Sequence, residues 1–189
     1  YTVNTGNVCD HDPSANGLAG SGYCIAGGIT GYLRGNSSIE YAYNTGCVSG
    51  SVNKGTEPCA GGIVGKYITD KALRYSKNSG NIRNYSKGSN ALQYCGSISG
   101  TDAVNASANC SVEYCGVGGR VHRASGWIIL DDGGTYPYQN YIFRNTTVLN
   151  EDKTPVSIYP ENIFYKGCVF WDGTSELPWE KSDWVEPEA

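Results

Sequence analysis

Cysteine side chains can bind metals, act as nucleophiles or form disulfides, and this 189-residue chain carries eight of them. It has two histidines, and no two cysteines form a Cys-x-x-Cys pair. Zinc sites usually combine closely spaced cysteines and histidines, so we predict no metal site and structural cysteines, either as disulfides or as buried free thiols. A cysteine nucleophile served by His11 or His122 is the weaker interpretation. The disulfide candidates, whose pairing the sequence leaves open, are Cys9, Cys24, Cys47, Cys59, Cys95, Cys110, Cys115 and Cys168.

The other patterns that could support catalysis are incomplete. Residues 96–100 have the spacing of a nucleophile elbow, but isoleucine stands where the serine should be. Asp131 and Asp132 are adjacent, and neighbours in a strand point to opposite faces, so a solvated turn is favoured over an acid–base pair. Residues 10–17 alternate oxygen ligands like a calcium loop but lack the final glutamate. We expect a turn-rich insertion there, with a weak calcium site as the alternative, and predict no catalytic residue, no cofactor and no enzyme activity.

Five Asn-x-Ser/Thr sequons accompany the cysteines. Such a density, together with eight cysteines, favours an oxidising compartment and a secreted glycoprotein. We therefore predict an extracellular or cell-surface location; the alternative is a bacterial surface protein whose sequons are never used. The candidate glycosylation sites are Asn36, Asn84, Asn105, Asn109 and Asn145.

Composition excludes several classes of protein. The net charge is −4 and the pI is near 5.1, whereas nucleic-acid binders present basic surfaces. The longest strongly apolar run covers residues 127–130, far short of the roughly 18 residues that a membrane helix needs. Aromatic residues make up 12% of the chain, which is unlike a disordered protein. We expect no nucleic-acid partner and no membrane insertion.

The chain repeats itself with a period of about 34 residues. Residues 38–49, 72–83 and 111–122 align without gaps and share a tyrosine, a glycine and flanking apolar residues. A second block begins at Gly27, Gly61 and Gly96, with spacings of 34 and 35. Residues 1–8 match the first template from its tyrosine onward, so we expect a processed form or a fragment.

Short alternating strands that recur at this period predict a parallel β-solenoid with about three strands per turn. We expect an all-β, single right-handed solenoid of about four to five rungs, a rung being one turn. It would span residues 1–174, with the repeats over about 1–122 and plainer rungs over about 123–174. Residues 175–189 would form a C-terminal cap or tail, in which Trp179 and Trp184 could cover the last rung. The alternative is a flexible tail that packs elsewhere. Ile29, Ile63 and Ile98 would stack as one inward column.

Equivalent side chains on successive rungs could also form functional columns. Tyr41, Tyr75 and Tyr114 recur at the repeat spacing. An exposed tyrosine column could bind sugar rings, whereas a half-buried one would stabilise the sheet through ring contacts, and we favour the structural role. Cys24, Cys59 and Cys95 recur at nearly the same period, so one pair among them could bridge.

The blocks GGITGY and GGIVGKY, alternating with YNTGCV and KNSGNI, resemble the GLUG repeat over roughly residues 1–122. That repeat occurs in bacterial surface proteins and in the non-catalytic region of some secreted immunoglobulin A proteases. The resemblance implies a β-rich, often adhesin-like surface module and supplies no catalytic residues. The many cysteines and sequons depart from the family pattern.

Three hypotheses about function follow. The first is a non-enzymatic extracellular structural protein: a glycosylated β-solenoid subunit of a filament, appendage or surface coat that associates end to end with itself or with a parent surface protein. The second is an adhesin or glycan-binding module that uses the tyrosine column. The third, and weakest, is a β-helix enzyme that degrades polysaccharides, because no row of acids recurs along the repeats.

Overall fold

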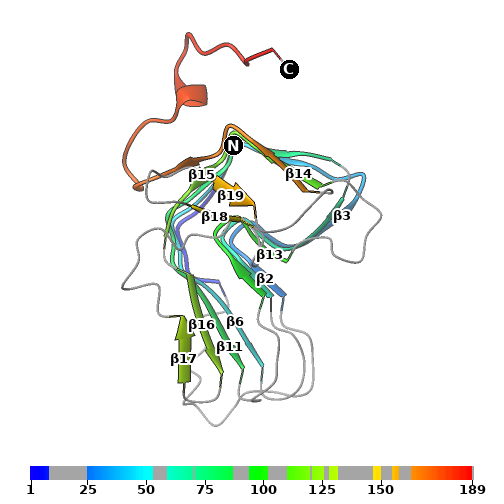
Figure 1. The fold of residues 1–189 in the computed structure, drawn as a ribbon, viewed down its shortest axis with the longest axis vertical. Helices are drawn as coiled ribbons and strands as arrows, with labels where there is room; N and C mark the ends of the chain where they lie inside the picture. The colour runs from blue at the N-terminus through cyan, green and yellow to red at the C-terminus, as the bar shows by residue number, and fades with distance from the viewer. Residues whose placement is uncertain are drawn as a thin grey trace.

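The protein is built from short β-strands. The computed structural model describes residues 1–8, 25–52, 59–69, 71–86, 94–101, 110–119, 121–125, 128–131, 147–149, 155–157 and 163–188 (Figure 1). Those residues contain many strands, one short 3-10 helix, η1 (Pro178–Glu180), and no α-helix. The predicted all-β class is therefore confirmed.

Most of the strands form short, separate, parallel sheets. The largest sheet, called the β5 sheet, has the order β1 (Thr2–Asn4), β5 (Ala42–Asn44), β10 (Lys77–Asn78), β15 (Gly116–Val117) and β21 (Val169–Phe170). The β9 sheet has the order β4 (Ile39–Glu40), β9 (Leu73–Arg74), β14 (Cys110–Glu113) and β20 (Ile163–Lys166). The β11 sheet holds β6 (Val48–Val52), β11 (Ile82–Ser86), β16 (Val121–Ser125) and β17 (Ile128–Asp131).

Two three-stranded sheets complete the repeating part. The β7 sheet holds β2 (Ile25–Gly27), β7 (Cys59–Gly61) and β12 (Tyr94–Gly96). The β8 sheet holds β3 (Thr30–Gly35), β8 (Val64–Thr69) and β13 (Ser99–Thr101). A separate antiparallel pair is formed by β18 (Thr147–Leu149) and β19 (Pro155–Ser157).

The chain visits these sheets in a fixed order. From β2 onward it passes through the β7, β8, β9, β5 and β11 sheets, and then begins the same circuit again. Paired strands are therefore one repeat apart, as for Val48, Ile82 and Val121, which are register partners. The alignment of repeats made from the sequence is confirmed by this register.

Each circuit contains five short strands, where the sequence suggested about three. The additional breaks come at two kinds of position. One is a bend of two residues, such as Gly28 and Ile29 between β2 and β3. The other is a single residue with positive φ, such as Tyr41 between β4 and β5. A left-handed residue cannot continue a strand, so one long predicted strand becomes two.

The part after residue 123 departs further from the predicted plain rungs. β20 and β21 do pair in parallel with β14 and β15. However, β17 pairs antiparallel with β16, and β18 pairs antiparallel with β19. Only residues 126–127 separate β16 from β17, and a parallel crossover needs about a dozen residues or more. The short connection therefore forces a hairpin.

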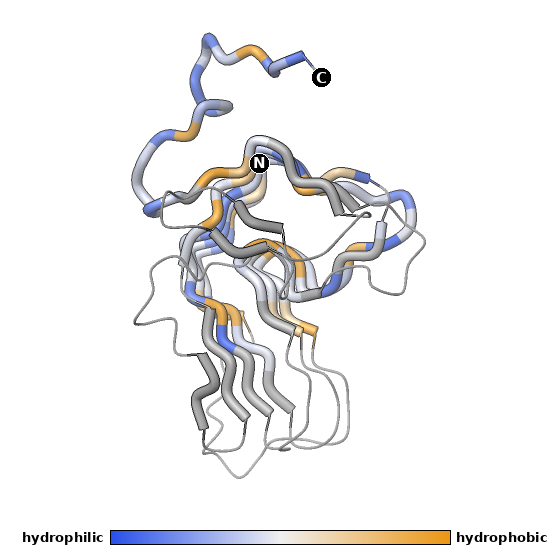
Figure 2. The backbone as a smooth tube through the Cα atoms, in the orientation of Figure 1, coloured by the Kyte–Doolittle hydropathy of each residue, from blue (hydrophilic) through white to orange (hydrophobic). Residues whose placement is uncertain are grey.

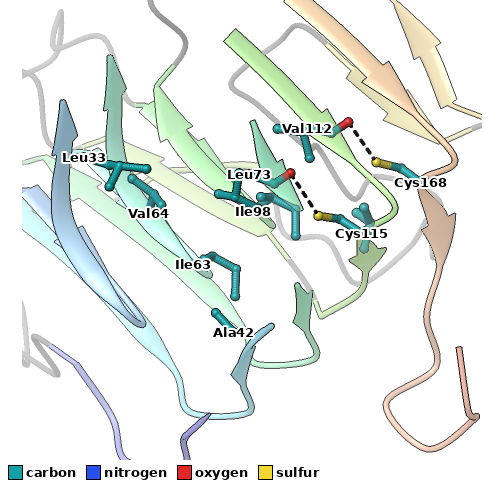
Figure 3. Close-up of a cluster of buried hydrophobic side chains, with 10 residues drawn as sticks. Leu33, Ala42, Ile63, Val64, Leu73, Ile98, Val112, Cys115 and Cys168 are labelled. Carbon is teal, nitrogen blue, oxygen red and sulfur yellow. Dashed lines mark hydrogen bonds between the residues drawn. The ribbon is translucent and has the colours of Figure 1, made fainter. Parts of the chain in front are cut away.

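The hydrophobic core runs along the inside of the repeats. Ile63 and Ile98 are fully buried, and Ile29 is half-buried. The backbone nitrogen of Ile29 donates to the Ile63 carbonyl, and that of Ile63 donates to the Ile98 carbonyl. The expected isoleucine column is thus present. Figure 2 shows apolar positions recurring side by side on successive strands, and Figure 3 shows the central cluster, including Leu73 and Val112.

Candidate functional site

The tyrosine column lies at the corner between the β9 and β5 sheets. Tyr41, Tyr75 and Tyr114 each follow the last residue of a strand, and each has a positive φ, of 54°, 51° and 50°. The left-handed conformation costs an ordinary residue about 1–2 kcal/mol. The rings stack at centroid distances of 5.0 Å for Tyr41–Tyr75 and 5.6 Å for Tyr75–Tyr114. Stacked aromatic pairs contribute roughly 0.5–1.5 kcal/mol each, which offsets part of that cost.

The exposure of the column changes along its length. Tyr1 is fully exposed and its ring lies 5.3 Å from that of half-buried Tyr41. Tyr75 and Tyr114 retain only 8% and 5% of their accessible surface. The position that follows Tyr114 in the column is Gly167, because Glu113 and Lys166 are register partners. The column therefore has one open end and a closed middle.

The C-terminal segment closes the middle of the column. The ring of Trp184 stands edge-on to Tyr75 and Tyr114 at 5.5 Å from each, and Trp179 lies 6.4 Å from Tyr75. Burial raises the pKa of Tyr75, and a hydrogen bond to the Glu186 carboxylate raises it further. Trp179 and Trp184 thus cover the side of the repeats, whereas the sequence suggested that they cover the last rung.

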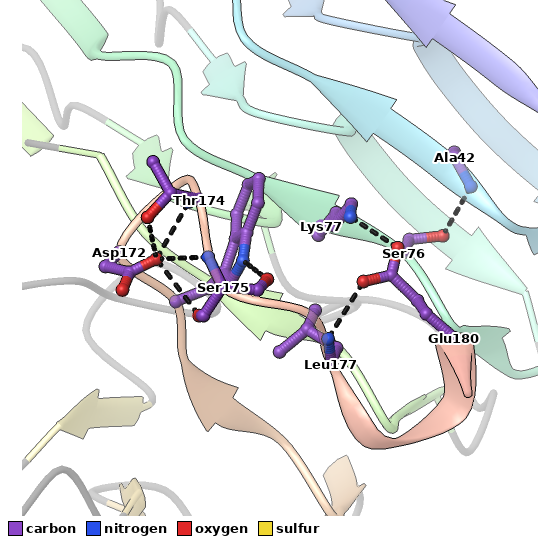
Figure 4. A network of polar contacts seen from close by, with 9 residues as sticks. Ala42, Ser76, Lys77, Asp172, Thr174, Ser175, Leu177 and Glu180 are labelled. Atoms are coloured by element: carbon purple, nitrogen blue, oxygen red, sulfur yellow. Dashed lines mark hydrogen bonds and ion pairs between the residues drawn. The ribbon is translucent and has the colours of Figure 1, made fainter. Parts of the chain in front are cut away.

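Polar contacts hold this segment in place (Figure 4). The Glu180 carboxylate accepts a hydrogen bond from the backbone nitrogen of Leu177 at 2.9 Å and pairs with the Lys77 ammonium. The same ammonium lies 4.9 Å from the centroid of Tyr43 and 4.7 Å from that of Trp171. Lys77 therefore joins the tail to the outer face of the β5 sheet.

A tight turn leads into the tail. One carboxylate oxygen of Asp172 accepts hydrogen bonds from the backbone nitrogens and hydroxyls of Thr174 and Ser175 (Figure 4). These bonds, those from the backbone foremost, hold the pKa of Asp172 well below its usual range. The indole nitrogen of Trp171 donates to the Ser175 carbonyl at 2.7 Å. The turn thus directs the chain back over Trp171.

An asparagine ladder runs beside the tyrosine column inside the β5 sheet. The side-chain nitrogen of Asn4 donates to Asn44 at 2.7 Å, and that of Asn44 donates to Asn78 at 2.8 Å. Asn44 and Asn78 are fully buried. Asn78 also donates to the carbonyls of Gly80 and Gly118. This ladder was not predicted from the sequence, although its signal is an asparagine two residues before each of Gly6, Gly46 and Gly80.

The repeating glycines make room for this ladder. A Cβ atom at Gly28 would lie 2.6 Å from Cγ of Asn44, and one at Gly62 would lie 2.4 Å from Cγ of Asn78. The next equivalent residue is Ser97, whose hydroxyl donates to the Gly118 carbonyl at 2.6 Å. In that repeat Val117 takes the place of the asparagine. The glycine-rich block and the asparagine are therefore parts of one packing arrangement.

The predicted cysteines are spread over several sheets. Cys59 is buried in β7, and its register partner is Tyr94, whereas Cys95 is paired with Ala60. Cys59 and Cys95 are thus displaced by one residue and are not register partners. Cys110 begins β14 opposite Ile163. The remaining described cysteines, which carry free thiols, are half-buried Cys47 and buried Cys115 and Cys168; Cys9 and Cys24 lie outside the described residues.

Two of the five sequons fall in the described residues. Asn36 is exposed in the turn after β3. Asn84 occupies the middle of β11, in register with Gly50 and Arg123. Asn105, Asn109 and Asn145 lie outside the described residues.

The weaker catalytic candidates that the structure describes lie in different parts of the fold. The hydroxyl of Ser97 is bonded to the Gly118 carbonyl, Asp131 ends β17 opposite Arg123, and His122 lies in β16 opposite Arg83. Residues 9–24, which include His11 and the calcium-like loop, and Asp132 lie outside the described residues. Within the described ranges, no group of three His, Cys, Asp or Glu side chains could hold a metal, and no helix has the length and apolar character to cross a membrane.

Comparison with known proteins gave no relative: no family model, no curated protein and no solved structure matches the chain.

Proposed function

We propose that this chain is a non-enzymatic extracellular structural protein, a glycosylated β-solenoid subunit of a filament, appendage or surface coat. One observation carries the proposal. Several buried polar side chains are bonded to the backbone or to equivalent residues of the next repeat, as in the ladder from Asn4 through Asn44 to Asn78. An active site would instead direct such groups towards a substrate.

The solenoid architecture is supported by the fixed order of sheets. Three successive circuits place equivalent residues in register, and their strands pair with the equivalent strands of the circuit before or after. Such nearest-neighbour stacking is what defines a solenoid. Parallel strands joined by crossovers are nearly always right-handed, so we propose a right-handed coil in which the β5 sheet contributes one strand per rung.

Membership of the GLUG-repeat group is proposed because the glycine-rich blocks have a packing role in the repeats. The glycine-rich blocks have a structural reason here, because Gly28 and Gly62 admit the amides of Asn44 and Asn78. A sequence pattern that encodes this packing can recur in any protein built on the same coil. The surface role of GLUG-repeat proteins then supports the extracellular location.

Glycosylation is proposed first at Asn36. Its side chain is exposed in a turn, where an added glycan would meet no packed neighbour. Bulky glycans on the outer face would keep a rod soluble and limit lateral association. Mass spectrometry of the native protein before and after enzymatic removal of N-glycans tests this assignment at each sequon.

End-to-end association is proposed at the β1 edge. β1 is the outermost strand of the β5 sheet, and Val3 on it is 58% exposed. An edge strand presents backbone donors and acceptors to which another strand can add. A Val3→Lys variant puts a charge on this edge, and Val185→Lys is the matched control because Val185 is 81% exposed in the tail.

Electron microscopy of the full chain is the test. The natural protein should form filaments with an axial repeat of about 24 Å, which is five strands at about 4.8 Å each. The Val185→Lys control should form them as well, and Val3→Lys should form far fewer. Isolated short rods in every sample would exclude the filament subunit. They would favour the adhesin hypothesis.

The adhesin hypothesis has one observation in its favour. Tyr1 and Tyr41 form the open end of the tyrosine column, with rings 5.3 Å apart, and an exposed aromatic face can stack on a sugar ring. A glycan array with the natural protein and Tyr41→Ala tests it, since binding that survives the substitution would not involve this column.

A further inference from the structure

Two thiols occupy neighbouring positions at the last parallel strand pair of the β5 sheet. Cys115 and Cys168 come directly before Gly116 and Val169, which are register partners. The backbone nitrogen of Val169 donates to the Cys115 carbonyl at 2.9 Å. Neighbouring strands lie about 4.8 Å apart, and disulfides join Cα atoms about 4.4–6.8 Å apart. The backbone spacing therefore suits a disulfide.

The two thiols also point to the same side of their strands (Figure 3). Cys115 Sγ lies 3.8 Å from the Leu73 carbonyl oxygen, and Cys168 Sγ lies 3.5 Å from that of Val112. Leu73 and Val112 are themselves register partners. The sulfurs therefore repeat the same contact one strand apart, so each lies next to the other in one column.

Earlier members of this column show that its side chains reach along it. Ser76 occupies the position equivalent to Cys115, because Lys77 and Gly116 are register partners. Its hydroxyl accepts a hydrogen bond at 3.2 Å from the backbone nitrogen of Ala42, the equivalent residue one repeat earlier. Ala42 and Ser76 are both buried. The column thus holds the small side chains of Ala42 and Ser76, and Cys115 and Cys168 occupy its last two positions.

We propose that Cys115 and Cys168 form a disulfide that ties β15 to β21. The bond would close a loop over the 52 residues from 116 to 167, the part of the sequence in which the regular repeat is interrupted. The inference goes beyond the proposed structural role, because it concerns a covalent bond that would form in any oxidising compartment.

The oxidation needs a low-molecular-weight disulfide such as glutathione disulfide. Cys168, which is 7% exposed while Cys115 is fully buried, attacks as a thiolate and releases one glutathione thiolate. Cys115 then loses its proton, attacks the Cys168 sulfur of the mixed disulfide and releases the second glutathione. Two thiols and one glutathione disulfide give one protein disulfide and two glutathione thiols. Burial raises the pKa of the Cys115 thiol well above its usual range, with a further contribution from Cys168. Because the thiolate is the attacking form, the second step should be fastest during folding, before Cys115 is buried.

Peptide mapping tests the bond directly. The full chain is refolded in a glutathione redox buffer, its remaining thiols are alkylated, and it is digested without reduction. Cleavage after Glu113, Arg120, Lys166 and Glu176 isolates the two cysteines, because residues 114–120 contain only Cys115 and residues 167–176 only Cys168. The expected product is one linked pair of these peptides that separates on reduction.

Variants supply the controls. Cys115→Ala and Cys168→Ser fit a column that already holds alanine and serine, and each should leave the other cysteine fully alkylated. Cys47→Ser, at a half-buried position elsewhere, should leave the linked pair unchanged. The proposal is overturned if Cys115 and Cys168 are both alkylated in the refolded natural protein, or if either is linked to a different cysteine.

Discussion

Replacing Asn78 by alanine removes the inner end of the asparagine ladder. Its side chain accepts hydrogen bonds from Asn44 at 2.8 Å and from the backbone nitrogen of Gly80 at 3.2 Å. It donates to the carbonyls of Gly80 and Gly118 and to the Ser97 hydroxyl. All five contacts are buried, so water cannot replace the lost amide without opening the packed repeats.

The magnitude follows from these contacts. A buried hydrogen bond contributes about 1 kcal/mol net, and a buried group left without its partner costs about 1–3 kcal/mol. Asn44 keeps its bond to Gly46, and Gly118 keeps its bond to Ser97, so only part of the loss is uncompensated. We expect Asn78→Ala to lower the free energy of unfolding by about 3–5 kcal/mol, a large share of the roughly 5–15 kcal/mol typical of a domain.

The matched control is Asn4→Ala at the other end of the same ladder. Asn4 makes the same kinds of bond, to Gly6 and to Asn44, but Gly6 is exposed and water can replace the contact. We expect a loss of about 1 kcal/mol or less. Urea unfolding of both variants, compared at equal m-values, gives the two numbers. Losses that agree within about 0.5 kcal/mol would refute the argument that burial makes the ladder stabilising.

Three further predictions concern the column and the tail. Burial raises the folded-state pKa of Tyr75 above its unfolded value of about 10. The stability that the neutral phenol contributes is therefore complete below about pH 10 and is lost as the pH rises towards the folded-state pKa. Urea unfolding should show that the free energy of unfolding falls less at alkaline pH in Tyr75→Phe than in the natural protein. Lys77→Met removes the ion pair and ring contacts that hold the tail, so limited proteolysis should release the tail at least about threefold faster than in the exposed control Lys181→Met, since about 1 kcal/mol of local stability is lost. Gly167→Ala introduces a Cβ 2.4 Å from the ring of Tyr114 at a φ of 61°, and should cost about 1–3 kcal/mol in thermal unfolding, because both the contact and the backbone are strained; an unchanged Tm would show that the last turn is not held there.

The repeating part was accessible to sequence reasoning because it depends on nearest neighbours. Ile39, Leu73 and Val112 align in the sequence and are register partners in the structure. A parallel stack with a fixed period turns a sequence alignment directly into a register. Such agreement requires no knowledge of distant contacts, so composition and period were enough.

The asparagine ladder was not predicted because an asparagine before a glycine can either bond within its own turn or bond to the next repeat. Asn44 and Asn78 precede Gly46 and Gly80 by two residues, which is also the pattern of a local turn. Both uses occur here, because Asn78 bonds its own turn at Gly80 and its neighbour Asn44. Only the burial of the amide separates a ladder from a turn, and burial depends on the repeat next to it.

The tail could not be placed from the sequence for a different reason. Trp179 and Trp184 occur once each, outside any repeat, so no period relates them to a partner. Their apolar character predicts a cap, but it does not select between the end and the side of a solenoid. The side is selected by Gly116, where a Cβ would lie 2.7 Å from the Leu177 side chain, and by the charge of Lys77 opposite Glu180.

The left-handed tyrosines explain why the column belongs to the scaffold. Glycine would adopt a φ near 50° without the cost of about 1–2 kcal/mol, and Gly167 does occupy the last such corner. A tyrosine occupies the three preceding corners, where its ring contacts offset part of this backbone cost. Stacking contributes on both sides of Tyr75, and Trp184 adds an edge contact to Tyr75 and to Tyr114. Rings that are needed to seat the tail are unavailable to a ligand, which confines any glycan binding on this column to its open end at Tyr1 and Tyr41.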